Sequence, residues 1–225
     1  RSSENNNTRA KFSLGFLYHE GKNMKRDITK SVVFYKEASS FNNEYAKNNL
    51  GILYKHGFKD IITKNPEKAK IYFEEAIKQK EDKVSMYNLA HIYIYEDSSE
   101  KSINESIDLL IKSSILNFEP SIKLLCLVLI KKYGENLNNV LNEIHDFSKS
   151  SKNLVSLISE KINKILDNQE MIDEKFQYFK NIDFIYNIES KPIVSCEIFN
   201  DKINKKFEDN QMDVINSNFY KGFEL

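Results

Sequence analysis

Apolar residues in the first part of the chain recur with the 3.6-residue period of an α-helix rather than with the alternation of a strand. In 10–21, for example, an alanine, two leucines, a tyrosine and a glycine share one helix face. The pattern predicts helices over about 8–20, 28–41, 43–57, 66–80, 83–96, 104–117, 119–133 and 136–149. Further apolar stripes predict a helix over 152–168 and another that begins near Ile172.

The helical pattern repeats along the chain. The motif Ala-x-x-x-Leu-Gly-x-Leu-Tyr-x-x-Gly spans 10–21 and returns over 46–57, and looser copies begin at Ser85 and Ser121. The first leucines of the four copies are separated by 36, 39 and 36 residues. Between the copies runs a second motif, two large apolar residues followed three positions later by a small one, at 34–38, 72–76 and 110–114. Each repeat therefore predicts two helices.

Capping residues support this division. An acidic or amide side chain stands where the second helix of a repeat should begin, at Asp27 and at Asn65, and Pro66 follows in the first helical position. In the third repeat, Ser102-x-x-Glu105 has the form of a capping box. We expect the second helices to begin at these residues.

Glycines occupy two positions in the first helix of each early repeat. A glycine within a helix costs about 1 kcal/mol relative to alanine, so Gly15 and Gly51 indicate that another helix approaches closely there. The third repeat has Ala90 at this position. Gly21 and Gly57 stand where the first helices should end, and they predict caps in the left-handed αL conformation.

A pair of helices cannot bury its own apolar face, so the pairs must stack on one another. The expected fold class is all-α: a right-handed α/α repeat solenoid with a helical C-terminal extension and one small β-hairpin. We place the solenoid at 8–150, with about four helix pairs of which the last is degenerate, and a helical cap at 151–225. Alternating apolar residues favour the hairpin at 182–199, and a helix that continues from about 170 is the alternative.

These repeats resemble the Sel-one-like repeat family, α/α repeats related to tetratricopeptide repeats. The resemblance rests on the glycine-containing motif, on the Asp or Asn that opens the next helix, and on the aromatic pair before a small residue. It covers 10–133 and is strongest in the first two copies, since Glu96 replaces the closing glycine of the third. The resemblance implies an adaptor that holds partner proteins together and carries no catalytic residues in its repeats.

Composition argues against several other classes of protein. The 225 residues contain 33 Lys+Arg and 33 Asp+Glu, so the chain lacks the basic excess typical of nucleic-acid binding. The longest apolar run, Leu124–Ile130, is far shorter than the roughly 20 residues of a membrane span. Histidines and cysteines do not have metal-ligand spacing, and no glycine-rich phosphate loop is present. We therefore expect a protein that is not an enzyme, with no catalytic residues, no cofactor and no bound metal.

The number of cysteines in the chain gives an indication of its cellular compartment. Only two cysteines occur, Cys126 and Cys196, which favours a reducing compartment such as the cytoplasm and leaves the endoplasmic reticulum and secretion as alternatives. Cys126 lies within the long apolar run, so it predicts a buried packing thiol rather than a nucleophile.

The helix stripe opposite the repeat core carries polar and aromatic residues that the core does not need. In the second and third repeats it consists of Asn49, Ile52, His56, Asn88, His91 and Tyr95. First helices line the concave surface of stacked α/α repeats, where amides would pair with the backbone of an extended peptide and rings would cover its side chains. The alternative is a solvated face.

The interpretation that follows is a non-catalytic scaffold or adaptor that binds another protein or peptide on its concave face, within a larger complex. Nucleic acid and a membrane span are not expected. Two alternatives stay open: an immunity-type inhibitor of one toxin or enzyme, and the regulatory arm of a larger protein.

Overall fold

A computed structural model describes residues 2–21, 25–134, 152–166, 172–180, 184–186 and 192–194. The chain divides into two compact units. The first contains the described residues up to Leu125 together with 184–186 and 192–194, and the second contains those of 126–180. The helix expected at 136–149, and the part of the expected cap beyond 194, lie outside the described residues.

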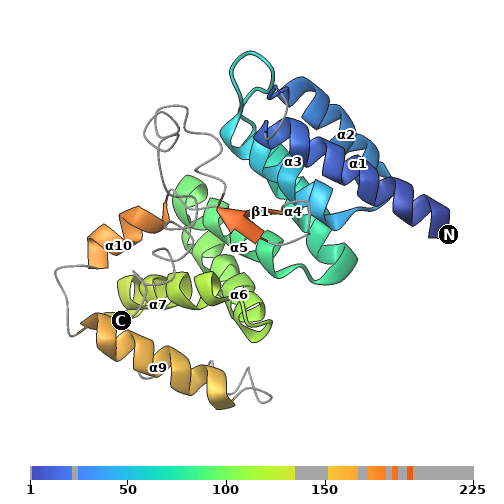
Figure 1. Cartoon of the computed structure of the whole chain (residues 1–225). Coiled ribbons are helices and arrows are strands. Elements are labelled where there is room, and N and C mark those ends of the chain that lie inside the picture. The colour runs from blue at the N-terminus through green and yellow to red at the C-terminus, as the bar shows by residue number, and fades with distance from the viewer. Residues whose placement is uncertain are drawn as a thin grey trace, which may run out of the picture. The chain divides into compact units, whose positions relative to one another are not determined.

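The first unit is an array of helix pairs (Figure 1). Its helices are α1 (Ser2–Glu20), α2 (Ile28–Ser40), α3 (Glu44–His56), α4 (Pro66–Lys80), α5 (Lys83–Ile92), the π-helix η1 (Tyr93–Asp97), α6 (Glu100–Ile115) and the first half of α7 (Glu119–Tyr133). Within the repeats α1 packs with α2, α3 with α4 and α5 with α6, while α2 meets α3 and α4 meets α5 between repeats. The described part of the chain is thus an all-α array of paired helices with one small hairpin, as the sequence predicts.

The glycines of the first helices lie where an aromatic ring of the second helix presses on them. A Cβ atom added at Gly15 would lie 2.6 Å from a ring carbon of Tyr35, and one at Gly51 would lie 2.5 Å from a ring carbon of Phe73. Both rings are fully buried, so neither has room to move away. The close approach expected from the sequence is therefore confirmed at both positions.

Two of the expected helix starts are confirmed. The side chain of Asp27 accepts a hydrogen bond from the backbone N–H of Lys30 at 2.9 Å, and Asn65 accepts one from Lys68 at 2.8 Å. Pro66 is the first residue of α4. Each cap residue also donates its own N–H to a tyrosine carbonyl of the preceding helix, a contact that fixes the angle between the paired helices.

The capping box expected at Ser102 is wrong. Helix α6 begins earlier, at Glu100, with Ser99 as its N-cap. The hydroxyl oxygen of Ser99 accepts from the backbone N–H of Ser102 at 3.2 Å. Ser102 is thus the third residue of the helix, and its own hydroxyl donates to Asp97 at 2.6 Å.

The first helices of the repeats are followed by residues with positive φ, namely Gly21, Gly57 and Ser98. Gly57 has φ 72° and ψ 171°, an extended conformation open almost only to glycine, so the αL prediction is wrong there. In the third repeat, where Glu96 replaces the glycine, the chain continues as η1 and turns at Ser98 with φ 56° and ψ 11°. Without glycine at the usual place, the positive-φ residue moves two positions later.

The first helices of the second and third repeats are more deeply buried than the second helices of the array. Nine of the 13 residues of α3 and nine of the 10 residues of α5 are buried. In α2 and α4 only five of 13 and three of 15 are buried. A helix that buries one stripe is at the surface, whereas α3 and α5 are enclosed on several sides.

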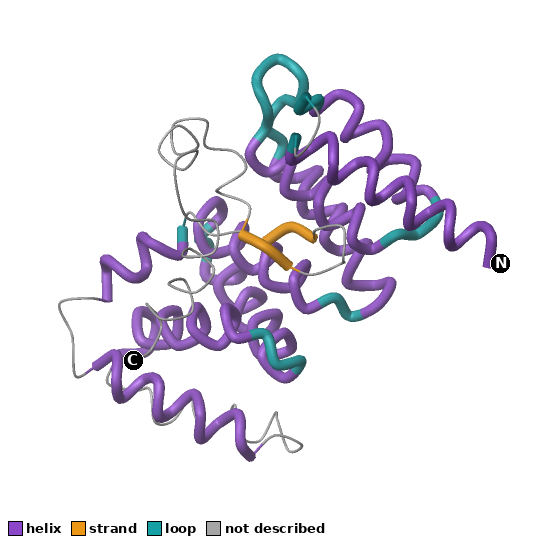
Figure 2. The backbone as a smooth tube through the Cα atoms, in the orientation of Figure 1, coloured by secondary structure: helices purple, strands orange, loops and turns teal. Residues whose placement is uncertain are grey.

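The hairpin expected near 182–199 is present, and the alternative of a continuing helix is wrong for its described residues. Strand β1 (Phe184–Tyr186) pairs antiparallel with β2 (Pro192–Val194), with Phe184 opposite Val194. Although far away in the sequence, β1 lies against α3 and α5. Figure 1 shows β1 as an arrow beside α5, and Figure 2 shows the two paired strands among the helices.

In the second unit, α9 (Lys152–Leu166) and α10 (Ile172–Phe179) follow the second half of α7. Helix α9 buries Leu154, Ile158 and Ile162 as one stripe. Cys126 is fully buried, with its sulfur 3.9 Å from the carbonyl oxygen of Ile158, so the packing thiol predicted from the sequence is confirmed. Cys196 lies outside the described residues.

Candidate functional site

The six candidate residues lie on consecutive first helices, three on α3, two on α5 and one on η1. As a correction to the sequence interpretation, most of them do not line an open surface. Asn49, Ile52 and Asn88 are 0% exposed and His91 is 1% exposed. His56 is exposed, and Tyr95 is half-buried. The buried members lie on the two helices that β1 packs against.

A row of buried polar side chains crosses the first helices. The side-chain oxygen of Asn48 accepts from the hydroxyl of Ser85 at 3.1 Å and from the amide of Asn88 at 2.8 Å, which joins α3 to α5. Asn48 in turn donates to the side-chain oxygen of Asn49 at 3.3 Å. The amide of Asn49 donates to the hydroxyl oxygen of Tyr35 on α2 at 3.1 Å. Burial of these side-chain amides is tolerated because each of them forms a hydrogen bond.

The row ends at a histidine in the first repeat. The hydroxyl of Tyr35 lies 3.4 Å from Nδ1 of His19. Burial, with a smaller contribution from the nearby Arg26 charge, lowers the pKa of His19 from 6.5 to about 3. Burial also raises the pKa of Tyr35, so both rings stay uncharged over the physiological range.

A second buried cluster joins α3 to the end of α5. The side-chain nitrogen of Lys55, which is 2% exposed, lies 2.7 Å from Nδ1 of His91, within hydrogen-bond distance. The ring of Tyr95 lies 4.5 Å from the ring of His91, and burial raises the pKa of the Tyr95 hydroxyl. Tyr95, half-buried, therefore connects this interior cluster with the surface.

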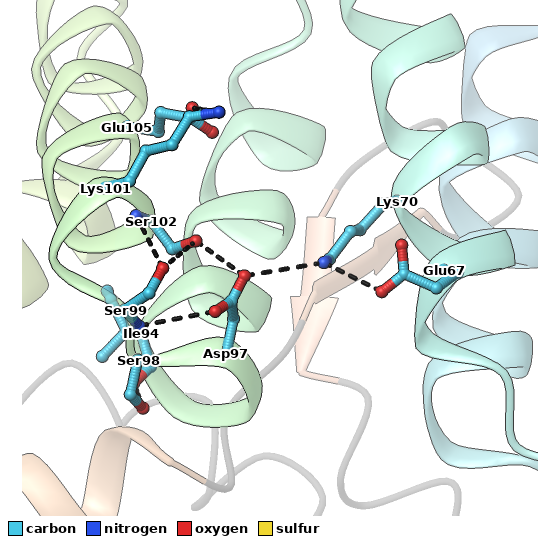
Figure 3. A network of polar contacts seen from close by, with 9 residues as sticks. All are labelled: Glu67, Lys70, Ile94, Asp97, Ser98, Ser99, Lys101, Ser102 and Glu105. Atoms are coloured by element: carbon cyan, nitrogen blue, oxygen red, sulfur yellow. Dashed lines mark hydrogen bonds and ion pairs between the residues drawn. The ribbon is translucent and has the colours of Figure 1, made fainter.

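A third polar network surrounds the start of α6 (Figure 3). Asp97 accepts from the hydroxyl of Ser102 at 2.6 Å and from the backbone N–H of Ser99 at 3.4 Å. Hydrogen bonds from these two serines lower the pKa of the Asp97 carboxyl. The ammonium of Lys70, on α4, lies 3.0 Å from Glu67 and 3.9 Å from Asp97. This network caps α6 and holds it to the second repeat, so we assign it a structural role.

Sequence reasoning missed Asn48, Lys55 and Ser85. Only Ser85 gave a signal: it stands where the first two copies of the repeat have Ala10 and Ala46. A hydroxyl at a core position needs a buried partner, which Asn48 supplies. The same replacement recurs at Ser121, whose hydroxyl lies 2.6 Å from that of Ser113.

Among the described residues, no group of three or more His, Cys, Asp or Glu side chains is placed to hold a metal ion. No described helix is both long enough and apolar enough to cross a bilayer. The polar groups that α3 and α5 bring together include side-chain amides, a serine hydroxyl, a lysine nitrogen and an imidazole, which hydrogen-bond to one another.

Paired helices at this spacing, with a glycine under an aromatic ring, define an α/α repeat protein. The sequence matches the Sel1 repeat over residues 8–40, 44–81 and 83–118. The chain is a Sel1 repeat protein, with three Sel1 repeats in residues 8–118. The fourth pair predicted from the sequence lies beyond these matches and stays a prediction.

Two solved structures share this fold. A Sel1 repeat protein from Oxalobacter formigenes has a TM-score of 0.51 and 19% identity, over 64% of this chain and 60% of that one. A protective antigen present in uropathogenic Escherichia coli strains, which displays an SLR fold, has a TM-score of 0.54 and 16% identity. That match covers 93% of this chain and 50% of the antigen. The chain thus spans about half to three fifths of the length of these neighbours. A comparison with curated protein sequences gave no match.

Proposed function

We propose that this protein is a non-catalytic scaffold whose inner helices, α3 and α5 with η1, bind an extended segment of a partner protein. Sel1 repeats typically mediate protein–protein interactions, and this repeat array has the features that such binding uses. The observation that carries the proposal is the cluster of Lys55, His91 and Tyr95, in which a half-buried aromatic ring covers a buried polar pair.

The accessible part of this face is its rim. His56 at the end of α3 is exposed, and Tyr95 at the end of η1 is half-buried. The two occupy equivalent positions in successive repeats, six residues after Leu50 and Leu89. Tyrosine is among the commonest energetic anchors of protein interfaces, because it offers a large apolar area and a hydroxyl. We therefore assign the first contact with a partner to this rim.

The test is partner binding by purified wild type and by Tyr95→Ala. We expect the variant to weaken binding by about 2 kcal/mol or more, measured by titration calorimetry with a partner first captured from the source cells. Ile71→Ser is the matched control, since Ile71 is 54% exposed on the outer helix α4 and should leave affinity unchanged. Equal affinity of wild type and a folded Tyr95→Ala protein would remove the proposal.

A further inference from the structure

The inner helices of the second and third repeats already have a neighbour from elsewhere in the chain. Strand β1 comes from the far end of the described chain, and it lies against α3 and α5. Helix α1 occupies the same place in the first repeat, and none of its substantial contacts is with β1. Of residues 7–20 in α1, nine keep partial or full exposure, in contrast to the enclosed α3 and α5. The added burial thus coincides with the position of the hairpin.

The hairpin itself is small. Each strand has three residues, and the described sheet has two strands. A two-stranded hairpin of this length is at best marginally stable alone, so it depends on the helices that it rests against. An element with so few backbone pairs is also one that opens at low cost, without unfolding the repeats.

We propose that the β1–β2 hairpin is an internal ligand of the α3–α5 face, and that an extended partner segment of similar apolar character competes with it. This inference rests on the proposed function, since it identifies what the partner must displace. The sequence Phe184-Ile185-Tyr186 of β1 indicates the kind of segment that the face accepts: extended, with large apolar and aromatic residues. The part of α3 and α5 that β1 covers then becomes available only when the hairpin leaves.

Competition of this kind lowers the apparent affinity for a partner. A partner binds only those molecules in which the hairpin has left the face. When these are a small fraction of the total, the apparent dissociation constant for the partner rises by the inverse of that fraction. Anything that holds the hairpin away would raise affinity without changing the binding face. The hairpin would therefore set the threshold at which the scaffold engages its partner.

The test uses the full chain and a fluorescent synthetic peptide with the sequence of residues 182–195. Neighbouring residues of a strand point to opposite faces, so a Phe184→Ser/Tyr186→Ser double variant and an Ile185→Ser variant weaken different faces of β1. One of these two faces packs on α3. We expect the variant that is altered on that face to bind the peptide at least about tenfold more tightly than the wild type. The other variant and Ile71→Ser should bind as the wild type does. Equal binding by all folded proteins, or no binding by any, would overturn the proposal.

Native-state hydrogen exchange on the wild type gives a second test that does not depend on the variants folding. Amides of 184–186 and 192–194 should exchange through an opening that leaves the α3 and α5 amides protected. Exchange of the strand amides only with global unfolding would show a permanent core element and would contradict the proposal. The two proposals can also be separated. If the hairpin opens but partner binding is insensitive to Tyr95→Ala, the proposed function is wrong and the proposal of an internal ligand stands.

Discussion

The residue with the most evident physical constraint is the glycine in the first helix of the early repeats. Gly51 is small because the buried ring of Phe73 lies where its Cβ atom would be. In the third repeat the glycine becomes Ala90, and the residue equivalent to Phe73 becomes Ile111. A smaller apolar side chain in the second helix makes room for the methyl group in the first. The two positions therefore form a size-matched pair.

This pairing predicts a change of sign in a double-mutant cycle. In the wild type, Gly51→Ala should lower the free energy of unfolding by about 1–3 kcal/mol, because the added methyl group overpacks the contact with Phe73. In a Phe73→Ile background the same change should be neutral or stabilising by up to about 1 kcal/mol, since alanine is the better helix former. Urea unfolding of the four proteins measures both values. A loss of equal size in the two backgrounds would contradict the size-matched pair.

His19 predicts a pH dependence of stability. Its pKa in the folded protein is about 3, below the ordinary value of 6.5, so the unfolded chain takes up the proton first. The contribution of His19 to the free energy of unfolding is therefore complete above pH 6.5. It is lost as the pH falls towards 3, by up to about 1.4 kcal/mol per pH unit.

His19→Asn supplies the matched variant, because asparagine retains an acceptor near the Nδ1 position and does not titrate. Unfolding measured between pH 7 and pH 4 should show a shallower pH dependence for the variant than for the wild type. Parallel curves would mean that burial does not lower the pKa of His19 in the folded protein.

Helix ends show how one substitution changes an element. The first two repeats turn at a glycine, whereas the third continues as a π-helix and turns at Ser98. The next helix then starts at Glu100, with its cap supplied by Ser99 and braced by Asp97 and Ser102 (Figure 3). A π-turn often marks a functional position, and here it presents Tyr95.

The cap on α6 gives a prediction for this element. Ser99→Ala removes the oxygen that accepts from the backbone N–H of Ser102, so the free energy of unfolding should fall by about 1 kcal/mol. Ser99→Thr keeps a hydroxyl and should lose less than half as much. Thermal melts of the three proteins measure the difference, and equal losses for alanine and threonine would assign the effect to packing rather than to the cap.

The sequence predicted the elements well where periodicity and caps agree. Helix α4 was expected at 66–80 and has those bounds, because Asn65 and Pro66 mark its start unambiguously. The start of α6 was misplaced since three serines, 98, 99 and 102, compete for the cap, and only the turn at Ser98 decides among them. The hairpin was predicted from alternation, but its position against α3 and α5 was not, because long-range packing leaves no local pattern.

For the molecule as a whole, the repeats explain the array of paired helices, and the hairpin lies against two of its first helices. The sequence correctly placed Asn49, Asn88 and His91 on the first helices but not in the interior, where each makes a hydrogen bond between repeats that a single repeat does not reveal. Because Asn88 and His91 are buried and hydrogen-bonded, we expect their replacement to destabilise the fold. Tyr95 and His56 are therefore the better positions for probing binding.

The central claim is that the inner helices, rather than the outer ones, meet the partner. The most direct measurement is photo-crosslinking in the source cells, with benzoylphenylalanine placed at position 95 or, as a control, at position 71 of α4. We expect the partner protein to be crosslinked from position 95 of the folded protein and not from position 71. A crosslink that forms from position 71 and not from position 95 would place the binding face on the outer helices and contradict the account.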